Sequence, residues 1–156
     1  MTLFESKYFA LSELISSQTA SRKGIDNTPT EKAIKNLEWL VKKILDPLRA
    51  KLGKPIVISS GYRSPKLNKD IGSSEGSQHV TGKAADIIVP GMTANEVFNF
   101  ICNKTSLPFD QVIEEFATIS SGWVHISYDR DKRRQRGIKM VATKSHGKIT
   151  YTRVLI

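Results

Sequence analysis

The sequence has a single cysteine and no long apolar stretch, and these two absences exclude several classes of protein. Cys102 alone cannot form an internal disulfide or a zinc site built from cysteines. No apolar run approaches the roughly 20 residues of a membrane span. Residues 1–7 lack the basic and apolar segments of a secretory signal. We therefore expect one domain spanning residues 1–156, a monomer made in the cytoplasm without a signal peptide.

Acidic residues are scarce at the C-terminal end of the chain, where basic residues are concentrated. Residues 1–128 hold 15 basic and 13 acidic side chains, whereas residues 129–156 hold nine basic and two acidic ones, a net charge of +7. Such a segment favours an anionic polymer as partner, although a solvated loop and hairpin would carry the same charge. No recognition helix or aromatic base-stacking pattern accompanies the charge, so specific nucleic-acid binding is not expected.

The clearest helix signal begins at Thr28. Thr28 is placed to cap the helix, Pro29 suits its first turn, and Glu31 completes a capping box. Apolar residues then recur at three- and four-residue spacing, which predicts a helix with one core-facing side. Pro47 is expected to kink or split this helix, and Gly53 to end it.

The remaining periodicity predicts an α+β fold, with a mostly antiparallel sheet and helices on one face. Besides the helix from Thr28, the expected elements are a short apolar helix or turn at 8–16, strands at 55–59 and 84–89, a long loop at 61–78 with a short helix starting at Ser64, a helix at 93–102, and strands at 111–116, 123–128, 138–143 and 149–155.

Three residues suggest a metal site. Asp86 interrupts the apolar run 84–89, where a carboxylate is costly to bury unless it is paired or metal-bound. Strand alternation places His125 on the more polar face of its strand, and His79 ends the long loop. Two imidazoles and one carboxylate suit a catalytic zinc ion, with the fourth position left to water. Taken singly, each residue could instead be a hydrogen-bonded core histidine or a paired aspartate.

The surroundings of these residues resemble the zinc D-Ala-D-Ala carboxypeptidase family. Three blocks occur in the family's order: SGYRS at 60–64, SQHVTGKAAD at 77–86 and WVHIS at 123–127. The stretches 17–27 and 45–49 are similar to the version of the family found in phages and prophages, and the resemblance covers about residues 9–128.

The resemblance implies a hedgehog/DD-peptidase-like fold with one Zn²⁺ per chain, ligated by His79, Asp86 and His125. It implies that Arg63 binds a carboxylate or carbonyl of the peptide substrate, since a guanidinium suits bidentate anchoring. Four further residues are candidates for shaping the substrate cleft, or simply for packing and capping turns: Tyr62, Ser77, Gln78 and Trp123.

The general base is less directly specified. Some members of the family carry an acidic residue three positions before the last histidine, where this chain has Gly122. The stretch 109–115 instead resembles the branch of the family in which a glutamate of the preceding strand acts as the base, and we favour Glu115 over Glu114. Alternation alone does not decide between the two, and either could be an exposed strand charge. His146, in an expected hairpin turn, is interpreted as a surface residue.

Taken together, the sequence predicts a zinc metallopeptidase that hydrolyses peptidoglycan stem peptides, as a D-Ala-D-Ala carboxypeptidase or as an endopeptidase. The resemblance implies a phage or prophage endolysin or a virion-associated lysin, acting at the cell wall after release at lysis or within a virion. The basic segment 129–156 could hold it to an anionic wall polymer. The alternatives are a non-catalytic zinc-bearing module on the same fold and a basic nucleic-acid-binding protein.

Overall fold

A computed structural model describes residues 4–155 and shows six strands in one mixed sheet. The strand order is β1-β2-β4-β3-β5-β6; β3 and β5 are parallel and every other neighbouring pair is antiparallel. The strands are β1 (Val57–Ser60), β2 (Ala84–Ile88), β3 (Gln111–Glu115), β4 (Trp123–Ser127), β5 (Ile138–Ser145) and β6 (Lys148–Arg153). The α+β class and the mostly antiparallel sheet are thereby confirmed.

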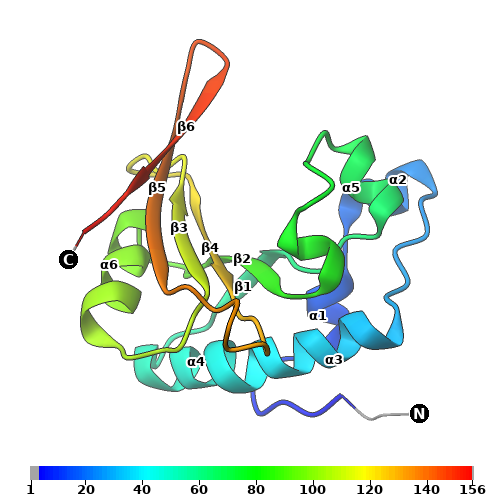
Figure 1. Cartoon of the computed structure of the whole chain (residues 1–156), viewed down its shortest axis with the longest axis horizontal. Helices are drawn as coiled ribbons and strands as arrows, with labels where there is room; N and C mark the ends of the chain where they lie inside the picture. Colours follow the sequence, from blue (N-terminus) through cyan, green and yellow to red (C-terminus); the bar gives the residue numbers. More distant parts are fainter. Residues whose placement is uncertain (1–3, 156) are drawn as a thin grey trace.

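The helices fall into two groups (Figure 1). One group is a long continuous helix, made of α3 (Glu31–Leu40), the π-helical η1 (Val41–Leu45) and α4 (Asp46–Leu52), together with α6 (Ala94–Lys104). The other gathers on the far side of the sheet from α6 and comprises α1 (Leu11–Ile15), α2 (Gln18–Lys23) and α5 (Pro65–Asp70). Within the described residues, no helix is long and apolar enough to cross a membrane.

The core lies between the first group of helices and one face of the sheet. Leu37, Ile44 and Leu48 of the long helix are fully buried and belong to the same cluster as Val124 and Ile126 of β4. Because side chains alternate along a strand, His125 points from the opposite face. Packing of the apolar face therefore fixes which side of the sheet presents the polar residues.

The predicted start of the long helix was wrong. The helix begins at Glu31 with Thr30 as its N-cap, whose hydroxyl accepts a hydrogen bond from the Ala33 amide at 3.1 Å. Thr28 is held upstream, since its amide and hydroxyl both donate to the Asp26 carboxylate, at 2.9 and 2.6 Å. An aspartate side chain that bonds the backbone two residues on competes with helix capping in this way.

The end of the helix at Gly53 is confirmed, but Pro47 does not break the chain of helical turns. Pro47 is the second residue of α4, directly after the π-helical η1, so the helical turns continue through a π-helical stretch next to the residue that cannot donate a backbone hydrogen bond. Gly53 ends α4 in the left-handed conformation, with φ of 63°, and its amide bonds the Arg49 carbonyl.

Gly61 brings the segment after β1 against α1. The Tyr62 amide donates to the Leu14 carbonyl at 2.7 Å, and a Cβ on Gly61 would collide with that same carbonyl. A glycine is thus required where SGYRS packs on α1. This contact also fixes the position of the Gly61 carbonyl, which matters for the site described below.

We predict that Gly61→Ala destabilises the fold by about 1–3 kcal/mol, because the added methyl meets backbone that cannot move aside. Urea denaturation measures the change. Gly76→Ala is the matched control, since its Cβ would meet nothing closer than the Ser74 hydroxyl at 4.0 Å. Equal unfolding midpoints for both variants would contradict the close packing of Gly61 on α1.

Candidate metal centre

His79, Asp86 and His125 meet on the sheet face opposite the core. His79 lies in the 3₁₀-helix η2 (Gln78–Thr81), while Asp86 and His125 are the middle residues of β2 and β4 and pair directly across the ladder. Their candidate ligand atoms all lie within 4.8 Å of one another, and all three residues are buried. Antiparallel pairing therefore joins two members of the cluster, and a turn supplies the third.

The distances within the cluster suit a tetrahedral ion. Asp86 Oδ1 is 3.3 Å from His79 Nε2 and 3.1 Å from His125 Nδ1. Ligand atoms bound tetrahedrally to zinc, each about 2.0–2.2 Å from the metal, stand about 3.3–3.6 Å apart. Two imidazole nitrogens and one carboxylate oxygen also form a donor set that zinc prefers, so these residues fit the metal.

Hydrogen bonds on the outer nitrogens orient both imidazoles. His79 Nδ1–H donates to the Gly61 carbonyl at 2.7 Å, which leaves Nε2 as the lone-pair nitrogen. His125 Nε2–H donates to Gln78 Oε1 at 3.1 Å, which leaves Nδ1 facing Asp86. Outer partners of this kind fix the tautomer of metal-binding histidines. Both rings are thus oriented with their inner nitrogens toward one shared centre.

The Gln78 contact continues into a chain of polar groups. Gln78 Nε2 donates to Asp110 Oδ2 at 2.7 Å, so its carbonyl oxygen must face His125. Arg136 donates to the same carboxylate through its amide, Nε and Nη2. Burial alone would raise the pKa of Asp110, but these hydrogen bonds outweigh it and lower that pKa. Asp110 and Arg136 belong to no recognisable site motif, and the sequence did not predict them as site residues.

Asp86 is held as a carboxylate. Burial alone would raise the pKa of Asp86, but hydrogen bonds and charge from His125 and His79 outweigh it and place that pKa well below its usual range. A buried carboxylate needs such partners or a metal to stay ionised.

Glu115 and Glu114 point to opposite faces of β3. Glu115 pairs with Trp123 in the ladder, and its Oε1 lies 3.8 Å from His125 Nδ1, on the side of the cluster. Glu114 is buried on the other face, where its Oε1 accepts a hydrogen bond from Asn95 of α6 at 2.7 Å. Burial raises the pKa of Glu115, and so does the negative charge of Asp86. The positive charges of His125 and Arg63 lower it, but by less. Only Glu115 therefore lies where it could exchange a proton at the centre.

The backbone at Gly122 explains why an acid is absent there. Gly122 has φ of 99°, and a Cβ at this position would lie 2.7 Å from Ala117 Cα and 2.9 Å from the Glu115 carbonyl oxygen. No side chain fits this turn, so a carboxylate near the cluster has to come from the neighbouring strand.

A family comparison agrees with this geometry. The model of the family described as peptidase M15 matches residues 7–127, which contain the whole cluster, Arg63 and Glu115. The chain belongs to the peptidase M15 family. No match to it was found among curated proteins. The resemblance drawn from the sequence blocks is confirmed. Membership makes the chain a metallopeptidase-type hydrolase whose family depends on zinc.

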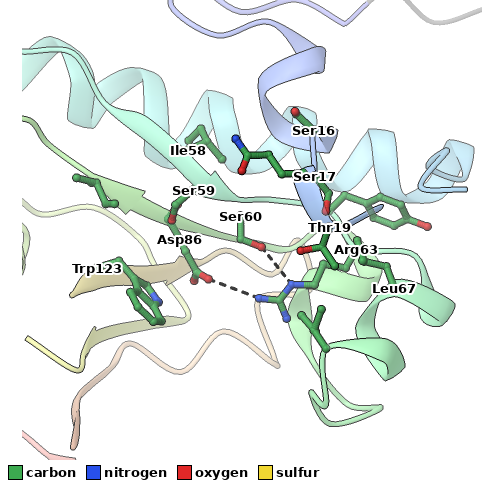
Figure 2. A pocket seen from close by; sticks show the side chains of 14 residues that line it. Ser16, Ser17, Thr19, Ile58, Ser59, Ser60, Arg63, Leu67, Asp86 and Trp123 are labelled. Atoms are coloured by element: carbon green, nitrogen blue, oxygen red, sulfur yellow. Dashed lines mark hydrogen bonds and ion pairs between the residues drawn. The ribbon is translucent and has the colours of Figure 1, made fainter. Parts of the chain in front are cut away.

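Arg63 of this M15 chain stands beside the cluster (Figure 2). Its Nη2 is 3.6 Å from Asp86 Oδ2, its Nε donates to Ser60 at 3.1 Å, and its Nη1 donates to Asn68 at 3.3 Å. Figure 2 shows the guanidinium reaching across the cleft toward Asp86, with Trp123 beyond the carboxylate. The cation is therefore fixed in place next to the candidate metal ligands.

The other four predicted site residues surround the cluster in different ways. Ser77 caps η2, its hydroxyl accepting a hydrogen bond from the His79 amide. Tyr62 is almost fully buried, and Trp123 packs edge-on against Phe116 in the cleft wall. Gln78 lines the cleft that also contains Glu115 and His125. Both ends of its amide are hydrogen-bonded, to His125 and to Asp110. Substrate contacts by these four residues stay a prediction.

We predict that Gln78→Met weakens zinc binding about 10–100-fold, because His125 loses the acceptor that fixes its tautomer. Competition with a chromophoric chelator measures the affinity. Gln111→Met is the matched control, a half-buried glutamine of the same cleft with no side-chain hydrogen bond among the described residues. Equal zinc affinity of the Gln78 variant and the native protein would contradict the orienting role of Gln78.

Proposed function

We propose that the protein is a zinc-dependent peptidase that cleaves peptidoglycan stem peptides at bonds involving D-amino acids. The observation that carries the proposal is the joint placement of Glu115 and Arg63 around the His79–Asp86–His125 cluster. A carboxylate able to move a proton and a fixed cation thus flank one candidate metal centre. Peptide hydrolysis needs both groups around the carbonyl that is attacked.

Zinc held by His79, Asp86 and His125 would supply a Lewis acid and lower the pKa of water at the site. Glu115 takes the proton of the attacking water, for which its raised pKa and its 3.8 Å distance from His125 are suited. Arg63 holds the carbonyl oxygen on which negative charge develops. Glu115 then returns the proton to the leaving amine.

The proposed substrate rests on the family and on the residue blocks shared with it. The segments 17–27 and 45–49 resemble phage and prophage members, which supports a lysin that reaches the wall at host lysis or within a virion. The position of Glu115 weighs against the non-catalytic alternative, because a proton-accepting group is present although Gly122 cannot provide one.

The direct test is digestion of purified peptidoglycan followed by mass spectrometry of the released fragments. We expect the protein to cleave stem-peptide bonds. A chelator should stop the cleavage and added zinc should restore it, because without the metal nothing activates the attacking water. Hydrolysis that persists after complete zinc removal would contradict a metal-dependent mechanism. Absence of hydrolysis by the zinc-loaded protein would contradict the proposed function.

Glu115→Gln is expected to lower kcat by about 10²–10⁴-fold, because the amide cannot accept the proton. Glu114→Gln is the matched control. Glu114 accepts a hydrogen bond from Asn95 on the opposite face of the sheet, so activity should change little. Zinc content should be unchanged in both variants. Loss of activity in the Glu114 variant with activity kept in the Glu115 variant would reverse the assignment.

We also propose that the basic segment 129–156 contacts an anionic wall polymer. Part of its charge is neutralised within the fold, since Arg136 pairs with Asp110 and Arg133 with Asp131. Lys132, Lys144 and Lys148 are exposed and enter no ion pair among the described residues. These three lysines, together with Arg153, which is equally exposed and likewise unpaired within residues 4–155, are free charges available to a polymer.

Replacing Lys132, Lys144 and Lys148 together with glutamine should weaken sedimentation with purified walls and reduce its salt dependence, because fewer counterions are exchanged. Replacing Lys32, Lys35 and Lys51 removes the same charge from the exposed side of the long helix and is the control. Equal losses in the two triple variants would indicate net charge rather than the C-terminal segment as the cause.

A further inference from the structure

The candidate metal centre lies between two clefts. The first, of about 630 Å³, lies between the sheet and the second helix group and is bordered by residues of α2, of α5 and of the connection between α1 and α2 (Figure 2). The second, of about 640 Å³, runs over β3 and β4 toward the β5–β6 hairpin. Arg63, Asp86 and Trp123 line both clefts. Open space therefore extends from the cluster in two directions, and each cleft has the size of a ligand pocket.

The first cleft continues past Arg63 with neutral polar groups. Beyond the Arg63–Asp86 pair, its polar lining consists of hydroxyl and amide side chains, among them Ser16, Ser17 and Thr19. No second cation lines this cleft, within the part of the chain that the structure describes. A peptide whose chain ended there would leave its carboxylate without a cationic partner beyond Arg63, whereas a continuing backbone finds donors and acceptors.

The second cleft is walled by a part of the chain that lies outside the matched family region. The β5–β6 hairpin follows residue 127, where the match ends. In the ladder, Glu115 pairs with Ala142 of β5, and Ala142 pairs with Tyr151 of β6, so the three share one face. Tyr151 therefore lies two strands away from Glu115, and neighbouring strands stand about 4.8 Å apart. Ala142 between them is buried, and Glu115 and Tyr151 both line the cleft.

Tyr151 is the half-exposed aromatic residue at the far end of this cleft. Its side chain is 54% exposed, and it lines the cleft together with Met140 and Ile113. Burial, and then the negative charge of Glu115, raise the pKa of Tyr151, in keeping with a phenol on the same surface as the proposed base. An exposed aromatic side chain beside apolar neighbours is a common contact for peptide ligands.

We infer that the substrate occupies both clefts, so that the enzyme cleaves an internal bond of the stem peptide rather than releasing its terminal residue. The inference rests on the proposed function. In this arrangement Arg63 faces the bond that is cleaved, and the hydroxyl-lined cleft holds the chain on one side of it. Tyr151 is the specificity-determining residue that holds the chain on the other side.

Two synthetic stem peptides that differ only at the C-terminus, as a free carboxylate or a carboxamide, test the inference. We expect both to be cleaved with kcat/KM values within about threefold of each other, since no terminal carboxylate is recognised, and every product to contain two or more residues. Release of the terminal residue alone, with the carboxamide inert, would overturn the inference and leave the proposed function standing. Failure of the zinc-loaded enzyme to cleave either peptide or wall would overturn both.

Binding provides a readout independent of turnover. With Glu115→Gln as the background, calorimetry with the uncleaved carboxamide peptide should show a Kd about fivefold or more higher for Tyr151→Ala. Thr152→Ala, on the opposite face of the same strand and paired with Val141, is the matched control and should leave Kd unchanged. Equal affinity with and without the Tyr151 ring would contradict a substrate contact by the hairpin.

Discussion

The direct pairing of Asp86 with His125 across β2 and β4 is the constraint on which the site depends. This register places a carboxylate and an imidazole side by side on the face opposite the core. The apolar neighbours of His125 are buried against the long helix, so slippage by one residue would expose the core and bury the site. The same packing that stabilises the fold therefore holds two of the three candidate metal ligands in position.

The third ligand depends on close backbone contacts. His79 is oriented by the Gly61 carbonyl, and Gly61 in turn packs on the Leu14 carbonyl of α1. The glycine of the SGYRS block thus connects the outer helices to the orientation of an imidazole. Gln78 performs the corresponding function for His125, with Asp110 and Arg136 behind it. The rigidity of the site comes from these outer groups as much as from the three residues that would bind zinc.

Much of this could be predicted from the sequence because local signals carried it. The Thr93–Glu96 capping box predicted the start of α6, and strand alternation predicted that His125 lies on the polar face. The prediction of Thr28 as the cap was wrong because a second local signal, the Asp26 carboxylate two residues upstream, competes with helix capping. The choice between Glu115 and Glu114 needed the sheet order, which alternation within one strand does not contain. The Gln78–Asp110 hydrogen bond and the placement of Tyr151 two strands from Glu115 join residues more than 30 positions apart in sequence, and neither had a local signal.

The proposed mechanism depends on one zinc ion that joins His79, Asp86 and His125. Anomalous diffraction at the zinc absorption edge, from crystals of the protein as purified, measures this directly. We predict one peak per chain, about 2.0–2.2 Å from His79 Nε2, an Asp86 oxygen and His125 Nδ1. A zinc peak bound elsewhere, or three side chains that stay apart in zinc-saturated crystals, would contradict it.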